Sequence, residues 1–161
     1  MKMNNYEFFW SGPFSQWYPS VFHCDGVKFY TAEQYMMVHK AILFKDLKMI
    51  NKILKTKNPR EQKALGRKVA NFDANKWNNK AKEIVERGNY CKFSQNKDLK
   101  KILLDTYPKI LVEASPYDKI WGIGLDESDA LRTKPENWPG TNWLGIVLTK
   151  VRNNILLEGK T

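Results

Sequence analysis

Apolar residues recur at helical spacing around residues 29–44. Thr31 and Gln34 have the S/T-x-x-E/Q spacing of a capping box, which predicts a helix that begins at Ala32. Apolar residues then follow at intervals of three or four, as on the buried side of a helix. The expected buried stripe comprises Met37, Ala41 and Phe44.

Further helices are predicted where a capping residue precedes apolar residues at helical spacing. Asn58-Pro59 is a strong start, because Pro is favoured at the first helical position. Gly and Pro mark the expected ends. One predicted helix follows Asp46. The next three run from Asn58 to near Gly66, from Asp73 to about Gly88 and over 96–106. The last follows Asn142 and extends as far as Gly159.

Short β-prone segments separate these helices. Residues 21–23 and 27–30 flank the turn signal Cys24-Asp25-Gly26 and predict a hairpin. The expected strands outside the hairpin are 6–10, 110–114 and, more weakly, 120–123, and the polar stretch 124–140 is expected to be an irregular loop. The pattern predicts an α+β fold, a mainly helical single domain over residues 1–161 with a small antiparallel sheet.

The length of 161 residues suits one domain. Cys24 and Cys91 have no metal or redox spacing, so we expect free thiols in a reducing compartment. The two histidines, His23 and His39, are too isolated to suggest a metal site. Neither a signal peptide nor a membrane-spanning run is visible, so we expect a cytoplasmic protein without a membrane partner.

The chain is basic, with 27 Lys and Arg against 17 Asp and Glu and a formal net charge of +10. This charge suits polyanionic or phosphorylated ligands, including DNA or RNA. Genome composition also produces Lys-rich surfaces, so the charge alone leaves both explanations open.

Candidate chemistry begins with Glu33 and Lys40, which are seven residues apart and therefore share one face of the predicted helix. A carboxylate in the first turn of a helix is stabilised by the helix dipole. Glu33 is thus a candidate catalytic base. The alternative is an ordinary first-turn charge, with Lys40 a solvated lysine.

Aromatic residues lie in a predicted loop. Residues 11–20, SGPFSQWYPS, contain two Pro, one Gly and three Ser, which is typical of a loop. Loops with exposed aromatics tend to bind ligands, whereas buried ones close the edge of a core. Both interpretations apply equally to Phe14, Trp17 and Tyr18.

Two clusters lie near the C-terminus. Asp118 and Trp121 are three apart in a segment flanked by Pro and Gly, so one interpretation is a turn that presents both side chains to one cavity. The alternative is that Asp118 forms an Asx turn with nearby backbone. Asn142 precedes a helix whose exposed amides are a natural phosphate site. The alternative there is a simple loop and cap.

The motifs together resemble the NADAR family, whose members include a swarming-associated N-glycosidase branch acting on riboflavin intermediates and an ADP-ribose glycohydrolase branch. The similarity runs in order from about Phe9 to about Arg152. One departure is Gln16-Trp17, where many members have Asn-Phe. The motifs are FSQWYP, TAEQYMMVHKA, NPREQKALGR, KFSQN, LVEASPYDKIWGIGL and WPGTNWLG.

The resemblance implies a hydrolase of the N-glycosidic bond between a base and a phosphorylated or ADP-linked ribose. Its implied substrates are early pyrimidine ribosyl-phosphates of riboflavin synthesis, or ADP-ribosyl-guanine, including in nucleic acid; the Lys excess favours the second. It implies no cofactor and no metal. The expected catalytic residues are Glu33, Asp118 and Trp121, and the expected substrate-binding residues are Phe14, Trp17, Tyr18, Tyr35, Lys40, Arg60, Arg67, Lys92 and Asn142.

A rival from another class is a non-catalytic module that binds ADP-ribose or nucleic acid. Such a module needs a pocket, cations and aromatic residues but no paired acids. Because the chain retains both Glu33 and Asp118, we expect an enzyme.

Overall fold

The computed structural model describes residues 3–160. It divides into two compact units, one of residues 3–15 and 97–160 and the other of Gln16–Asn96. Helices dominate, and the strands form an antiparallel hairpin and a separate parallel pair. The predicted mainly helical α+β class with a small antiparallel sheet is therefore confirmed, whereas the single-domain organisation stays a prediction.

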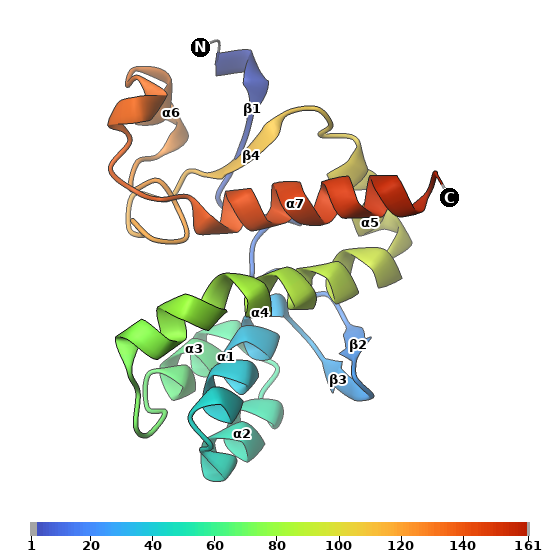
Figure 1. Ribbon diagram of the computed structural model, residues 1–161, viewed down its shortest axis with the longest axis vertical. Helices are drawn as coiled ribbons and strands as arrows, with labels where there is room; N and C mark the ends of the chain where they lie inside the picture. Colours follow the sequence, from blue (N-terminus) through green and yellow to red (C-terminus); the bar gives the residue numbers. More distant parts are fainter. Residues whose placement is uncertain (1–2, 161) are drawn as a thin grey trace. The chain divides into compact units, whose positions relative to one another are not determined.

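In the unit Gln16–Asn96, three helices gather beside a long one (Figure 1). The hairpin pairs β2 with β3, with Cys24 opposite Val27. The predicted hairpin is present, with β2 beginning one residue later than expected, and the helix after it begins at Ala32 as predicted. The elements are β2 (Phe22–Cys24), β3 (Val27–Phe29), α1 (Ala32–Leu43), α2 (Leu47–Leu54), α3 (Pro59–Gly66) and α4 (Ala74–Gln95).

Helix α1 begins as its capping residue predicts. The Thr31 hydroxyl accepts a hydrogen bond from the Gln34 N–H at 3.0 Å. The Gln34 side chain does not close the reciprocal bond of a capping box; it accepts from the Tyr30 N–H at 2.8 Å and donates to the Ile53 carbonyl at 3.0 Å. One buried amide thus fixes the start of α1 against the end of α2.

Helix α4 is longer than predicted. The sequence suggested an end at about Gly88, because Gly often terminates helices, but the helix continues to Gln95. Gly88 lies inside the helix, where the ring of Tyr35 takes the space of a side chain. The predicted helix over 96–106 is correspondingly the shorter α5 (Lys97–Leu104).

The other unit is built on a parallel strand pair. Tyr6 pairs with Ile110 and Phe9 with Glu113. Helix α7 packs on β4, and Figure 1 shows it running past both strands. The elements are η1 (Met3–Asn5), β1 (Tyr6–Phe9), α5, β4 (Ile110–Glu113), α6 (Glu127–Leu131), η2 (Pro135–Asn137) and α7 (Trp143–Glu158).

Two predictions for this unit are wrong. Residues 120–123 form a turn and not a strand, because their carbonyls bond to the chain just before and inside α7, as in Trp143 N–H to Ile120 at 3.0 Å. The stretch 124–140 is not wholly irregular, since it contains α6 and η2. The Asp126 side chain caps α6 by accepting from the Asp129 N–H at 2.8 Å, a local signal already visible in the sequence.

Candidate functional site around Glu33

Glu33 lies in the first turn of α1 and is only 4% exposed. Its N–H, one of the first helical donors, bonds to the Gln16 carbonyl at 2.9 Å. Helix N-termini carry partial positive charge, which stabilises a carboxylate there. The fold therefore holds a buried carboxylate at a helix start, as the candidate base requires.

Lys40 lies two turns further along α1 and is half-buried. Burial lowers the pKa of its ammonium, while the negative charge of Glu33 raises it and the positive charge of Arg67 lowers it further. Lys40 is therefore within electrostatic reach of both Glu33 and Arg67. The structure thus brings Glu33, Lys40 and Arg67 together.

Two aromatic rings flank the Lys40 ammonium. Its Nζ lies 4.6 Å from the ring centre of Phe72 and 5.9 Å from that of Trp77. Phe72 precedes α4 and is 48% exposed, and Trp77 lies in the first turns of α4. Neither ring was predicted to belong to the site. The signal available was two aromatics on either side of the capping residue Asp73.

The aromatic loop contributes exposed and partly buried rings. Trp17 is 37% exposed, and the Lys63 ammonium on α3 lies 5.9 Å from its ring centre. The ammonium of Lys92, from α4, lies 5.9 Å from the ring of Tyr18. Lys92 is fully buried, and burial lowers its pKa to about 7.

The side chain of Gln16 attaches this loop to α4. Its Oε1 accepts a hydrogen bond from Asn89 Nδ2 at 2.8 Å, and the same amide nitrogen donates to the Val85 carbonyl at 2.9 Å. Gln16 therefore contacts α1 through its backbone and α4 through its side chain. Gln16 belongs to the pair Gln16-Trp17 that was expected to depart from the family pattern, which stays a prediction, and Asn89 was not among the predicted residues.

Other predicted residues occupy different surroundings. Tyr35 is 2% exposed, and its ring packs against Phe29 at 5.1 Å and His39 at 4.1 Å, so it belongs to the core. Arg60 is exposed in the first turn of α3. Phe14, in the other unit, is buried against Phe9 with 5.5 Å between ring centres. For Phe14 the core-edge interpretation therefore holds.

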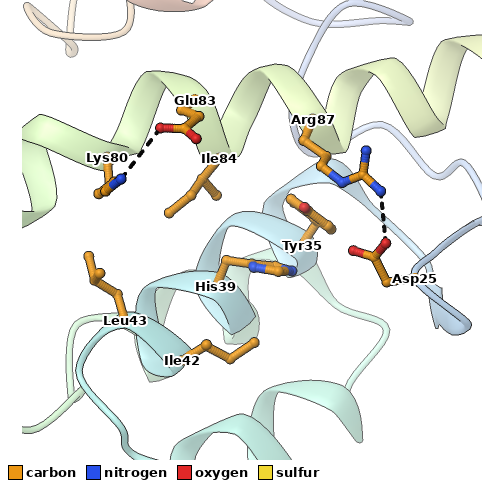
Figure 2. A pocket seen from close by; sticks show the side chains of 9 residues that line it. All are labelled: Asp25, Tyr35, His39, Ile42, Leu43, Lys80, Glu83, Ile84 and Arg87. Carbon is orange, nitrogen blue, oxygen red and sulfur yellow. Dashed lines mark hydrogen bonds and ion pairs between the residues drawn. The ribbon is translucent and has the colours of Figure 1, made fainter.

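A groove of about 290 Å³ lies between α1 and α4 (Figure 2). His39 and Ile42 line it from α1, and Ile84 lines it from α4. Ion pairs border it, Lys80 with Glu83 at 3.7 Å and Arg87 with Asp25 at 2.8 Å. On a helix of 3.6 residues per turn, Tyr35, His39 and Ile42 lie on a different side of α1 from Glu33 and Lys40, so most of the α1 lining of this groove is apart from the candidate site.

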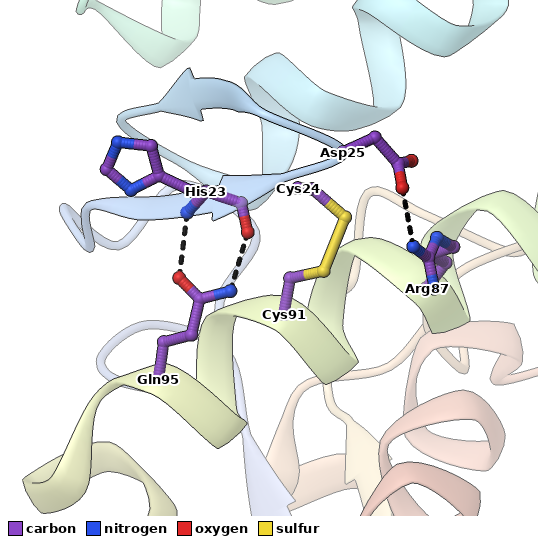
Figure 3. Close-up of polar contacts among 6 residues, drawn as sticks. All are labelled: His23, Cys24, Asp25, Arg87, Cys91 and Gln95. Carbon is purple, nitrogen blue, oxygen red and sulfur yellow. Dashed lines mark hydrogen bonds and ion pairs between the residues drawn. A yellow bond between two sulfur atoms is a disulfide. The ribbon is translucent and has the colours of Figure 1, made fainter.

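The two cysteines are joined in a disulfide between β2 and α4 (Figure 3). The expectation of free thiols is therefore wrong. Close packing of the hairpin on α4 brings the two sulfurs together across a separation of 67 residues, which no local spacing reveals. Gln95 supports the same contact, accepting from the His23 N–H at 2.8 Å and donating to its carbonyl at 2.5 Å.

In the unit of residues 3–15 and 97–160, Asp118 forms an Asx turn. Its Oδ1 accepts from the N–H groups of Ile120 at 2.9 Å and Trp121 at 2.8 Å. The Trp121 ring packs edge-on against Trp143 at 5.4 Å. The turn brings Asp118 and Trp121 together; that they line the same pocket as Glu33 stays a prediction.

Contrary to the sequence prediction, the helix amides at Asn142 are not exposed, and a substrate-binding role of Asn142 stays a prediction. The N–H groups of Asn142, Trp143 and Leu144 bond to the carbonyls of residues 120–122 at 3.0 Å each and are not free for an anion. The Asn142 side chain is also engaged, since it accepts from the Glu113 N–H and donates to the Leu111 carbonyl. Asn142 thus ties the start of α7 to β4.

Within residues 3–160, no group of three or more His, Cys, Asp and Glu is arranged to hold a metal ion. In the same residues, no helix has both the length and the apolar character needed to cross a membrane.

Comparisons with known proteins place these features in a family. The model of the NADAR domain matches residues 8–156. The chain is 49% identical over 144 residues to N-glycosidase R617 of Acanthamoeba polyphaga mimivirus, covering 86% of this chain and 85% of that protein. It is 32% identical over 113 residues to the riboflavin biosynthesis protein PYRR of Arabidopsis thaliana, covering 68% of this chain and 17% of that protein.

The fold agrees with a solved structure as well. The NMR structure of the E. coli protein YbiA matches with a TM-score of 0.80 and 25% identity, over 99% of this chain and 90% of that one. The family match covers nearly the whole chain and includes Glu33, Lys40 and Asp118. The chain is therefore a member of the NADAR family.

Proposed function

We propose that this protein is an N-glycosidase that hydrolyses the bond between a base and a phosphorylated or ADP-linked ribose. The observation that carries the proposal is the buried carboxylate of Glu33 at the start of α1, within electrostatic reach of Lys40, which is itself within reach of Arg67. The similarity to a viral N-glycosidase supports the reaction class.

The chemistry follows from the charge at the sugar. As the bond between C1′ and the base nitrogen breaks, the bonding pair leaves with the base and positive charge develops on the ribose. Glu33 stabilises that charge and takes a proton from water, whose oxygen then bonds to C1′. The departing base takes up a proton. Asp118 is the second candidate carboxylate, and Trp121 the candidate stacking ring.

The cations near Glu33 suit the phosphate group of the substrate. Arg67 is close enough to Lys40 for its positive charge to disfavour the charged form of Lys40. A phosphate group between them offsets that repulsion, because it offers oxygens to both. Trp17, with Lys63 beside it, is an exposed ring for stacking.

Two substrates fit this description. Pyrimidine ribosyl-phosphates of riboflavin synthesis are supported by the similarity to PYRR. ADP-ribosyl-guanine, free or in DNA, is supported by the net charge of +10, which exceeds what one small phosphate ligand needs. The rival binding module needs no buried carboxylate, so Glu33 favours the enzyme.

Mass spectrometry of the products tests the proposal. The protein is incubated with riboflavin-pathway pyrimidine ribosyl-phosphates and, separately, with ADP-ribosylated DNA. We expect release of a free base with the matching ribose phosphate, or of ADP-ribose with restored guanine. Binding without either product would favour the non-catalytic module.

A further inference from the structure

We infer that Phe72 and Trp77 are positioning residues that hold the Lys40 ammonium in place to bind the substrate phosphate beside Glu33. This inference rests on the proposed function, in which Lys40 contacts phosphate. It goes further by assigning a role to two aromatic residues outside the motifs that resemble the family.

The geometry is that of a cation held against two rings. The Lys40 Nζ lies 4.6 Å from the ring centre of Phe72 and 5.9 Å from that of Trp77, both within the range of cation–π attraction. Phe72 lies just before α4 and Trp77 lies in its first turns, whereas Lys40 lies in α1. The contact therefore depends on tertiary packing and not on helix spacing.

Phe72 is itself held in position. Its ring lies 5.5 Å from that of Phe44 at an interplanar angle of 59°, and the ammonium of Lys76 lies 5.8 Å from the ring of Phe44. The Phe72 ring is 48% exposed, so burial alone does not fix its position. Its contacts with Phe44 and Lys40 supply that order.

Lys40 needs such support because of its surroundings. Its ammonium is partly desolvated, which opposes its positive charge; the Glu33 carboxylate favours that charge, Arg67 opposes it, and the net effect is a lowered pKa. A lysine side chain without such contacts has many rotamers and readily moves out of surroundings that oppose its charge. The negative faces of the two rings restrict Lys40 and offset part of the lost hydration. The ammonium is thereby held ready for an anion before substrate arrives.

A double-mutant cycle tests this role. The variants are Phe72→Leu, Trp77→Leu, Lys40→Met and each Leu variant combined with Lys40→Met. Calorimetry measures the Kd of ribose 5-phosphate, and turnover of a pyrimidine ribosyl-phosphate measures KM and kcat. Thermal unfolding by circular dichroism confirms that each variant is folded. Tyr107→Leu is the matched control, since it removes an exposed ring from a cation, Arg152, in the other unit.

We expect Phe72→Leu and Trp77→Leu each to raise Kd and KM about 3- to 10-fold, from the size of cation–π energies, with a smaller effect on kcat. In the Lys40→Met background the same changes should have no further effect, because the residues act through Lys40. Phe72→Tyr and Trp77→Phe, which keep a ring, should restore wild-type values. Tyr107→Leu should change none of them.

Three results would overturn the inference. Equal effects of Phe72→Leu in both backgrounds would mean that Phe72 contacts the ligand directly. No effect with Lys40 present would mean that the rings do not position it. An unchanged Kd in Lys40→Met would show that Lys40 does not bind the phosphate, and the inference would then fail. Because Kd is measured without turnover, loss of the N-glycosidase assignment is recognised separately, by an absence of product with wild-type protein.

Discussion

The ring of Tyr35 on α1 occupies the space that a side chain on Gly88 of α4 would need. A Cβ built on Gly88 lies 2.4 Å from Cδ1 and 2.9 Å from Cγ of Tyr35. Real Cβ atoms do not approach so closely, and a buried ring cannot move aside without disturbing its neighbours. The absence of a side chain at Gly88 therefore lets the helix that carries Glu33 pack closely on α4.

Gly88→Ala should destabilise the protein by about 1–3 kcal/mol, because overpacking at this contact outweighs the usual helical preference for Ala. Urea unfolding measures the change. Gly159→Ala is the control: its nearest atoms lie at 3.6 Å or more and its φ is −68°, so it should stay within about 0.5 kcal/mol of wild type. Equal stability of Gly88→Ala and wild type would show that the two helices can separate at little cost.

Glu33→Gln should reduce kcat by about 10²- to 10⁴-fold, because it removes the charge while keeping the size of a general base. Single-turnover assays measure the chemical step. Glu83→Gln is the control, since it removes a carboxylate from the exposed face of α4. Full turnover by folded Glu33→Gln would exclude Glu33 as the catalytic group.

Asp118→Asn should lower kcat more than it weakens substrate binding, if this carboxylate acts mainly in the transition state. An Asn oxygen can still accept both bonds of the Asx turn, from Ile120 and Trp121, so the change isolates the charge. Comparing kcat with the Kd of the substrate separates the two effects. A normal kcat with weaker binding would make Asp118 a residue that positions substrate.

Lys92 should make stability depend on pH between about 7 and its ordinary pKa of 10.5. Its pKa is lowered in the folded state, so in this window the unfolded chain binds a proton that the folded chain does not. The free energy of unfolding therefore gains a contribution that rises with pH across the window. Urea unfolding at pH 6.5, 8 and 9.5 should show a steeper rise in the wild type than in Lys92→Met, and parallel curves would contradict a lowered pKa.

A salt series should separate the two candidate substrates. Cleavage of ADP-ribosylated DNA should weaken steeply with salt, because each phosphate that the protein neutralises releases counterions. Cleavage of a free pyrimidine ribosyl-phosphate should change little. Turnover of the free intermediates with none on the DNA would exclude the nucleic-acid substrate and leave the N-glycosidase proposal intact.

Local signals in the sequence were sufficient to predict where several elements begin. Thr31, Asn58 and Asp73 each cap a helix at the expected residue, through bonds to N–H groups two or three positions ahead. Such bonds form within one turn and need no distant partner, so they can be read without a structure. Glu33 was recognisable for the same reason, since its place in the first turn of α1 follows from the cap.

Contacts between distant segments decided the rest. Helix α4 continues through Gly88 because the Tyr35 ring packs against this glycine. Residues 120–123 form a turn because their carbonyls accept hydrogen bonds from the start of α7. Cys24 meets Cys91 only when the hairpin packs on α4. Phe72 belongs beside Lys40 for the same kind of reason. These features depend on which surfaces pack together, and packing is a property of the whole chain that no window of neighbouring residues contains.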